Sequence, residues 1–349
     1  MTRLDAAYEL VAIDSLSRRE ATIASFVEQR LRGGGTLDVE RVGDNVVART
    51  TGRRATRVLV AGHLDTVPGD PEVATIDGGR LIGVGACDMK GSLAVMLELA
   101  LDPAPRSVEV TWIFYAREEI GRAESGLLEL AELRPDLLSA DVALLAEPTG
   151  GRVEAGCQGS LRAEVTLTGR RAHTARPFTG RNAVHRMSEL LGRVANYESR
   201  VVEIDGVSFC EQLQAVAIEG GVAANVVPDR CTVTLNHRVA PDRTRDEAAT
   251  ALREFLGDVV EEGDELSVVD WAPSALPALT HARFATLVEL TGAPAAAKVG
   301  WTDVATFQEM QIPATNFGAG DPLLAHRSDE YVTLEELDEF ARVLRAWLA

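Results

Sequence analysis

The sequence predicts an α/β protein with a mostly parallel sheet, into which a second domain of ferredoxin-like α+β type is inserted. Three observations predict this class. Apolar runs alternate with helical patterns over residues 1–159, a β-α-β-β-α-β order follows over residues 160–273, and helical patterns return over residues 274–349. A chain of 349 residues, of which 46% are hydrophobic and 25% charged, can bury the cores of two such domains.

In the first segment, the spacing of the apolar residues gives the expected elements. Ser17 and Glu20 have the spacing of a capping box, which predicts the start of a helix before the apolar residues at positions 23, 26 and 31. Strands are expected at residues 45–48, 57–61, 108–115 and 141–145, and helices at residues 91–100 and 126–133. Because strands and helices alternate, the sheet should be largely parallel.

The pattern changes at Ser160. Strands are expected at residues 160–169, 213–221, 230–239 and 265–271, with helices at residues 182–197 and 244–256. This is the order of a ferredoxin-like unit. Helical and apolar patterns resume after Pro277, so we expect this domain to be inserted into the first one.

The composition excludes several kinds of partner. A net charge of −18 argues against nucleic acid and anionic membrane surfaces, which are bound by clustered basic residues. No apolar run approaches the roughly 18 residues of a membrane span, and MTRLDAAYEL at the N-terminus does not resemble a signal peptide, so a cytoplasmic protein is expected. The four cysteines lie far apart and are expected to be free thiols: Cys87, Cys157, Cys210 and Cys231.

The stretch AGHLDTVPGD, residues 61–70, places His63 and Asp65 two residues apart at the end of an apolar run. Along a strand, residues i and i+2 point to the same side, so the two side chains should be neighbours. One interpretation is a loop histidine beside a solvated carboxylate. The other is a metal-ligating imidazole whose second nitrogen is held by the carboxylate.

Four further fragments place acids or a histidine where a strand ends or in a loop: residues 83–94, 114–121, 144–151 and 323–330. With the first stretch they supply His63, Asp88, Glu118, Glu119, Glu147 and His326. Open α/β sheets bind ligands at the carboxyl ends of their strands, and this set of oxygen and nitrogen donors suits two zinc or similar divalent ions.

Each of these residues also has an ordinary interpretation. The pair Glu118 and Glu119 could be a solvated strand end, Asp88 could cap the helix that begins near Gly91, and His326 could be a surface histidine. A dinucleotide loop at Gly83 and Gly85 is excluded, because Asp88 would face the pyrophosphate.

Taken together, GHLDTVP, GACDMKG, AREEIG, AEPTG and the late HRSDE resemble the M20 metallopeptidase family, and the resemblance covers essentially the full chain. It implies a zinc-peptidase-like catalytic domain with an inserted dimerisation or lid domain, and a homodimer. The implied activity is that of a dinuclear zinc hydrolase, with cobalt as a possible metal, acting on small acylated amino acids at amide bonds next to carboxylates. The implied metal ligands are His63 and Glu147 for one ion, Glu119 and His326 for the other, and Asp88 for both.

The resemblance also implies roles for other residues. Glu118 matches the general base, Asp65 the carboxylate that orients His63, and His173 a histidine that stabilises the developing oxyanion and reaches the partner's active site. The implied substrate contacts are Ser160, Asn225, Arg238 and Thr302.

One departure concerns Cys157, which stands where better-known members of the family that remove succinyl groups have an arginine. This leaves the acyl group open, with Arg238 and Ser160 as candidate contacts for its carboxylate. Two alternatives remain at this point: another amidohydrolase of the same family, such as a deacetylase or a dipeptidase, and a metal-binding scaffold without catalysis.

Overall fold

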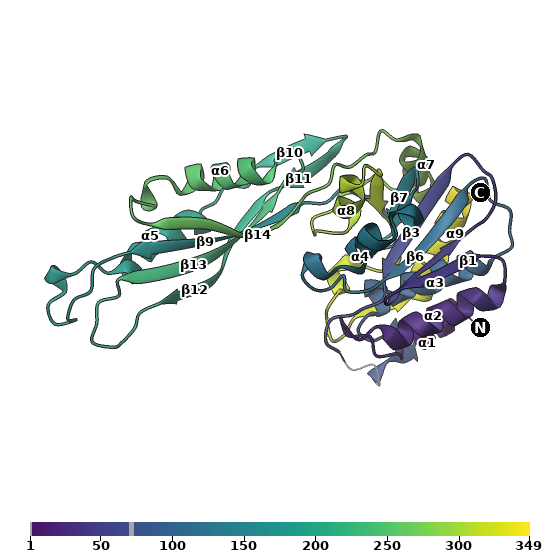
Figure 1. Ribbon diagram of the computed structural model, residues 1–349, viewed down its shortest axis with the longest axis horizontal. Coiled ribbons are helices and arrows are strands. Elements are labelled where there is room, and N and C mark those ends of the chain that lie inside the picture. Colours follow the sequence, from purple (N-terminus) through teal and green to yellow (C-terminus); the bar gives the residue numbers. More distant parts are fainter. Residues whose placement is uncertain (1, 70–72) are drawn as a thin grey trace. The chain divides into compact units, whose positions relative to one another are not determined.

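The computed structural model describes residues 2–69 and 73–349, which divide into two units (Figure 1). The first unit comprises Met1–Gly156, Pro277–Ala297 and Thr302–Ala349. The second comprises Cys157–Leu276 and Lys298–Trp301. The chain therefore leaves the first unit, builds most of the second, and returns to the first.

An eight-stranded sheet forms the centre of the first unit. Its order is β1 (Asp38–Val42), β2 (Asn45–Arg49), β6 (Glu109–Tyr115), β3 (Arg57–His63), β7 (Val142–Leu145), β16 (Ala314–Asn316), β8 (Glu154–Ala155) and β15 (Ala296–Ala297). The consecutive neighbours β6, β3, β7 and β16 run parallel, and their carboxyl ends therefore meet at one edge. The mostly parallel sheet predicted from the sequence is confirmed.

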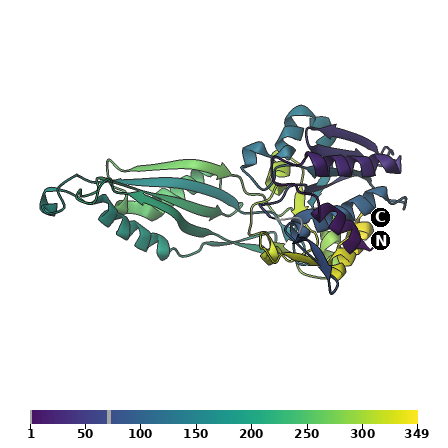
Figure 2. The same cartoon turned by 90° about the horizontal axis from the view of Figure 1, so that it is seen from below.

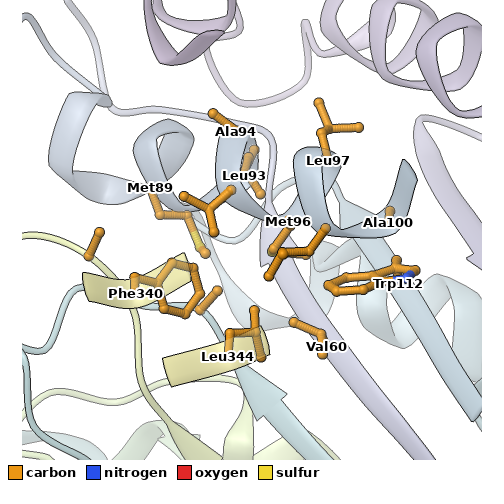
Figure 3. Close-up of a cluster of buried hydrophobic side chains, with 14 of the residues drawn as sticks. Val60, Met89, Leu93, Ala94, Met96, Leu97, Ala100, Trp112, Phe340 and Leu344 are labelled. Atoms are coloured by element: carbon orange, nitrogen blue, oxygen red, sulfur yellow. The ribbon is translucent and has the colours of Figure 1, made fainter. Parts of the chain in front are cut away.

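The strands β3, β6 and β7 are almost entirely buried, as expected for parallel strands with both faces covered. The helices of this unit are α1 (Arg3–Val11), α2 (Ala21–Gly34), α3 (Gly91–Leu101), α4 (Gly126–Leu133), α7 (Ala282–Thr291), α8 (Val304–Glu309) and α9 (Leu334–Leu348). Figure 3 shows α3 in the core, where Leu93 and Met96 lie near Phe340 and Leu344 of α9. A small sheet of β17 (Tyr331–Thr333), β5 (Arg80–Ile82) and β4 (Thr75–Asp77) completes the unit.

The second unit is a four-stranded antiparallel sheet packed against two helices (Figure 2). Along the chain its elements are β9 (Gly159–Thr168), α5 (Ala183–Ala195), β12 (Gln212–Gly220), β13 (Arg230–Val239), α6 (Arg245–Leu256) and β14 (Glu265–Ala272). The strand order β12-β13-β9-β14 is that of a ferredoxin-like unit, so this prediction is confirmed. A hairpin of β10 (Val201–Ile204) and β11 (Val207–Cys210), between α5 and β12, was not predicted.

The predicted capping box before α2 is wrong. The helix begins after Glu20, and no side chain caps it. The Ser17 hydroxyl instead donates to the Asp65 carboxylate at 2.7 Å, and Glu20 Oε1 accepts the N–H group of Arg117 at 3.0 Å. Both side chains therefore support loops of the candidate site that lie far from them in the sequence.

The expected thiols are confirmed, since all four cysteines are free. Among residues 2–69 and 73–349, no helix combines the length and the apolar character that a membrane span requires.

Candidate metal centre

Five side chains converge at the carboxyl edge of the parallel strands. His63 is the last residue of β3, Glu119 follows β6 and Glu147 follows β7. Asp88 lies in the loop before α3, and His326 lies in the loop that leads to β17. Residues from distant parts of the sequence meet here because neighbouring parallel strands end at the same edge.

The Asp88 carboxylate lies between the two imidazoles. Its Oδ1 atom is 3.1 Å from His63 Nε2, and its Oδ2 atom is 3.5 Å from His326 Nε2. His326 Nε2 is also 3.0 Å from the Glu119 carboxylate, and His63 Nε2 is 4.0 Å from Glu147 Oε1. One ligand atom each from His63, Asp88 and Glu119 can be chosen so that all three lie within 4.8 Å of one another, close enough to hold a cation.

Two imidazoles and several carboxylates face one another in this cluster. Burial alone would lower the pKa of His63, but its hydrogen bond to Asp88 and the charges of Asp88 and Glu147 raise the pKa well above its usual value. Hydrogen bonds to Asp88 and Glu119 raise the pKa of His326 to about 10. The imidazoles thus take up positive charge opposite the carboxylates, and a divalent cation satisfies the same anionic oxygens. The donor set therefore fits divalent metal ions.

Asp65 supports the site in a different way from the predicted one. His63 Nδ1 lies 2.9 Å from the backbone carbonyl oxygen of Asp65, whereas the nearest carboxylate oxygen is 3.7 Å away. The carboxylate accepts the N–H groups of Glu118 at 3.0 Å and Glu119 at 3.1 Å, together with the Ser17 hydroxyl. The backbone orients the imidazole, and the side chain fixes the loop that carries the two glutamates.

Glu118 is partly buried and lies among other acids. Desolvation raises the pKa of its carboxyl group well above the usual value; the positive charge of His63 opposes this shift, and Glu147 and Glu119 add to it. A carboxylate with a raised pKa is a better proton acceptor than an ordinary surface glutamate. The position and environment of Glu118 therefore suit a general base.

Four of the predicted residues lie in the second unit and form two pairs. Ser160 on β9 is directly opposite Arg238 on β13. Burial lowers the pKa of the half-buried Arg238, and within the described residues its guanidinium has no ion-pair or hydrogen-bond partner. His173 is exposed and lies beside the Asn225 segment, because the N–H group of Thr174 donates to the Asn225 carbonyl oxygen at 3.1 Å.

Thr302 belongs to the first unit and is only 3% exposed. Its hydroxyl donates to the Asn316 side-chain oxygen at 2.9 Å. This places Thr302 in a buried polar contact at the sheet, beside the end of β16.

No sequence pattern indicated a role for Glu330, and the spacing of Ser17 and Glu20 predicted a helix cap. Glu330 belongs to the HRSDE run that includes His326, and this position is the one signal that could have pointed to it. The contacts of Ser17 and Glu20 with the loops around Asp65 and Arg117 leave no local signal, because they join residues 48 and 97 positions apart.

Comparisons with known proteins match relatives over nearly the whole chain. The model of peptidase family M20/M25/M40 matches residues 59–349. A Mycobacterium tuberculosis protein, named provisionally as a succinyl-diaminopimelate desuccinylase, is 45% identical over 97% of this chain and 96% of its own. The succinyl-diaminopimelate desuccinylase of Corynebacterium glutamicum is 42% identical over 97% of this chain and 94% of its own.

Among solved structures, the aminopeptidase PepT from Bacillus cereus shares the fold, with a TM-score of 0.79 and 18% identity over 99% of this chain and 97% of its own. The family model covers more than half of the chain, and both desuccinylases match nearly all of it. The chain therefore belongs to peptidase family M20/M25/M40.

Proposed function

We propose that this protein is a metal-dependent amidohydrolase that cleaves N-succinyl-LL-2,6-diaminopimelate to succinate and LL-2,6-diaminopimelate, in the biosynthesis of lysine and diaminopimelate. The observation that most supports the reaction class is the placement of Asp88, whose two carboxylate oxygens face different imidazoles. The relatives named as desuccinylases, at 45% and 42% identity, support the substrate.

The metal complement of the proposal is two divalent ions per chain, zinc or, alternatively, cobalt. His63 and Glu147 would hold one ion, Glu119 and His326 the other, and Asp88 would bridge them. When bound, such ions lower the pKa of a water molecule toward about 7 and polarise the amide carbonyl.

The chain's own residues then carry the proton transfers and the positioning. Glu118 takes a proton from the attacking water and delivers it to the leaving nitrogen as the C–N bond breaks. His173 donates a hydrogen bond to the oxyanion that develops on the carbonyl oxygen. Arg238 and Ser160 hold the succinyl carboxylate, and Asn225 completes the substrate contacts. Thr302 acts from behind, because its buried hydroxyl donates to Asn316. Asp65 fixes the backbone of the Glu118 loop.

Metal binding is the first test. Purified protein should bind two zinc ions per chain, and hydrolysis should stop on chelation and return when zinc or cobalt is added. Metal analysis by mass spectrometry, run beside the rate measurement, checks both. A fully active enzyme with one ion or none would contradict the dinuclear site.

Substrate preference is the second test. Succinylated diaminopimelate should outcompete its acetylated analogue, because an arginine–carboxylate contact is charge-assisted and often bidentate. On the succinyl substrate, Arg238→Ala should lose on the order of 2–3 kcal/mol of transition-state stabilisation, roughly 30- to 150-fold in kcat/KM. On the acetyl substrate it should lose little. Arg162→Ala is the matched control, since Arg162 lies on β9 and pairs with the exposed Asp270. Equal rates on both substrates would favour the alternative of a deacetylase, to which Cys157 in place of arginine points.

We also propose a homodimer that forms through the second unit. In the order β12-β13-β9-β14, β12 is an edge strand. Two of its apolar residues, Val216 and Ile218, are 58% and 55% exposed. An unpaired strand edge with apolar side chains is a ready surface for pairing with a second copy.

A further inference from the structure

Glu330 is a buried carboxylate for which the proposed reaction gives no role. It is 1% exposed and lies four residues after His326. Its Oε1 atom accepts the N–H groups of Cys87 at 2.8 Å and Asp88 at 2.9 Å. Its backbone carbonyl oxygen accepts the N–H group of Gly83 at 2.9 Å. Glu330 is therefore bonded to the loop that carries Asp88 at three points.

The surroundings of Glu330 make these bonds energetically important. Within the described part of the chain, no lysine, arginine or histidine lies within ion-pair distance of its carboxylate, and its donors belong to the Asp88 loop. A buried charge without a cationic partner is costly unless hydrogen bonds compensate it. The N–H groups of Cys87 and Asp88 compensate the charge at Oε1, whereas Oε2 is buried and has no hydrogen-bond partner among the described residues. The carboxylate and the loop therefore hold each other in place through Oε1.

The Asp88 loop needs an outside acceptor because it is not regular helix. Asp88 has φ −119° and ψ 93°, and Met89 has φ −134° and ψ 30°, so the backbone departs from helical geometry where Asp88 is presented. Its N–H groups cannot all be satisfied within the loop. Glu330, which lies 243 and 242 positions after Cys87 and Asp88, accepts two of these N–H groups.

The same segment also delivers His326, whose Nε2 atom lies 3.5 Å from Asp88 Oδ2. Residues 326–330 thus contact the Asp88 loop twice: through the imidazole at the carboxylate, and through Glu330 at the backbone. Asp65 makes an equivalent arrangement with the N–H groups of Glu118 and Glu119. In both places a buried carboxylate binds two consecutive N–H groups next to a proposed ligand.

We propose that Glu330 is a positioning residue for the metal centre, which holds the Asp88 carboxylate between His63 and His326 through the N–H groups of Cys87 and Asp88. The inference rests on the proposed dinuclear site, and it predicts that the neutral oxygen of a glutamine can replace Oε1. Since both N–H groups donate to one oxygen, Glu330→Gln can keep both bonds, whereas Glu330→Ala removes them.

The test measures zinc affinity by competition with a chelator of known affinity, on the full-length chain stripped of metal. Loss of an outer contact to a ligand typically costs about 10- to 100-fold in metal affinity, and we expect a loss of that size for Glu330→Ala. Glu330→Gln should stay within about threefold of wild type. The matched control is Asp329→Ala, because Asp329 is exposed and pairs with Arg327 in the same loop.

A second readout reports geometry instead of affinity. Cobalt-loaded Glu330→Ala should show an altered visible absorption spectrum, whereas Glu330→Gln and Asp329→Ala should retain the wild-type spectrum. Thermal unfolding of the metal-free proteins shows whether each variant is folded before loading.

Two outcomes would overturn the inference. One is wild-type affinity and spectrum in Glu330→Ala. The other is an equal loss of zinc affinity in Glu330→Gln and Glu330→Ala. That result would show that the negative charge of Glu330, and not its contacts with the N–H groups, sustains metal binding. Failure of the proposed function itself is a different result, because the wild-type chain would then bind fewer than two ions.

Discussion

At the scale of single residues, the neighbours Glu118 and Glu119 have the same chemistry but different surroundings. The Glu119 carboxylate lies 3.0 Å from His326 Nε2, and no imidazole of the described residues lies at hydrogen-bond distance from Glu118. Asp65 binds the N–H groups of both residues and so fixes the backbone from which the two side chains diverge. The environment separates a proposed ligand from a proposed base, which the sequence alone leaves as an acidic pair.

This difference in surroundings predicts that replacing each glutamate by glutamine has a different effect. Glu118→Gln should keep both metal ions but lose about 10²- to 10⁴-fold in kcat, since general-base catalysis typically contributes that much. Glu119→Gln should weaken one metal site. Metal content and kcat measured on the same samples check the pair, with Glu124→Gln as control because Glu124 is exposed and pairs with Arg18. A Glu118→Gln enzyme within tenfold of wild type would contradict its role as the base.

At the scale of elements, the predictions succeeded where the pattern is local. Alternating apolar residues predicted β9 and β13, and helical spacing predicted α3 and α4. The hairpin β10–β11 was missed because β10, with the order Val-Val-Glu-Ile, has no strict apolar–polar alternation and buries none of its residues.

Predictions from local spacing were wrong where side chains bind loops that are distant in the sequence. Ser17 and Glu20 have the spacing of a cap, yet they bind Asp65 and the N–H group of Arg117. The metal-ligand motifs were visible because each lies at the end of an apolar run. Their supporting contacts were invisible, because hydrogen bonds across the fold depend on which strands become neighbours.

Asp264 joins three elements of the second unit and predicts a pH dependence of stability. Burial alone would raise its pKa, but hydrogen bonds from Arg186, Thr168 and Glu261 lower it to about 2. A carboxyl whose folded pKa lies below its unfolded value stabilises the fold above the unfolded pKa, here 3.8, and this contribution disappears as the pH falls to about 2. The shift corresponds to about 2 kcal/mol. Asp264→Asn should therefore be less stable than wild type near pH 7, and the difference should shrink between pH 4 and pH 2.

Urea unfolding of both proteins over this pH range checks the prediction. Asp270→Asn is the control, because Asp270 forms an exposed ion pair with Arg162, and such pairs contribute about 0–1 kcal/mol. A stability difference between wild type and Asp264→Asn that does not change with pH would show that the Asp264 charge is not involved.

At the scale of the whole molecule, the candidate residues are divided between the two units. The proposed ligands and Glu118 belong to the first unit, whereas His173, Asn225, Ser160 and Arg238 belong to the second. His173 is exposed, so its ring is available to a substrate or to another chain. In the proposed homodimer, a site can be completed by a histidine from the other copy.

This division gives a prediction that tests the dimer and His173 together. His173→Ala and Glu118→Ala chains should each be nearly inactive alone, but a mixed dimer would contain one site with Glu118 from one chain and His173 from the other. Random exchange makes about half of the dimers mixed, and each has one intact site of two, so activity should recover to roughly a quarter of wild type. Mixing Glu118→Ala with Glu119→Gln is the control, because both defects lie in the same unit and no intact site can form. Native mass spectrometry verifies that mixed dimers are present, and recovery near zero in that sample would mean that His173 serves its own chain. Activity of the His173→Ala chain alone would mean that His173 takes no part in catalysis.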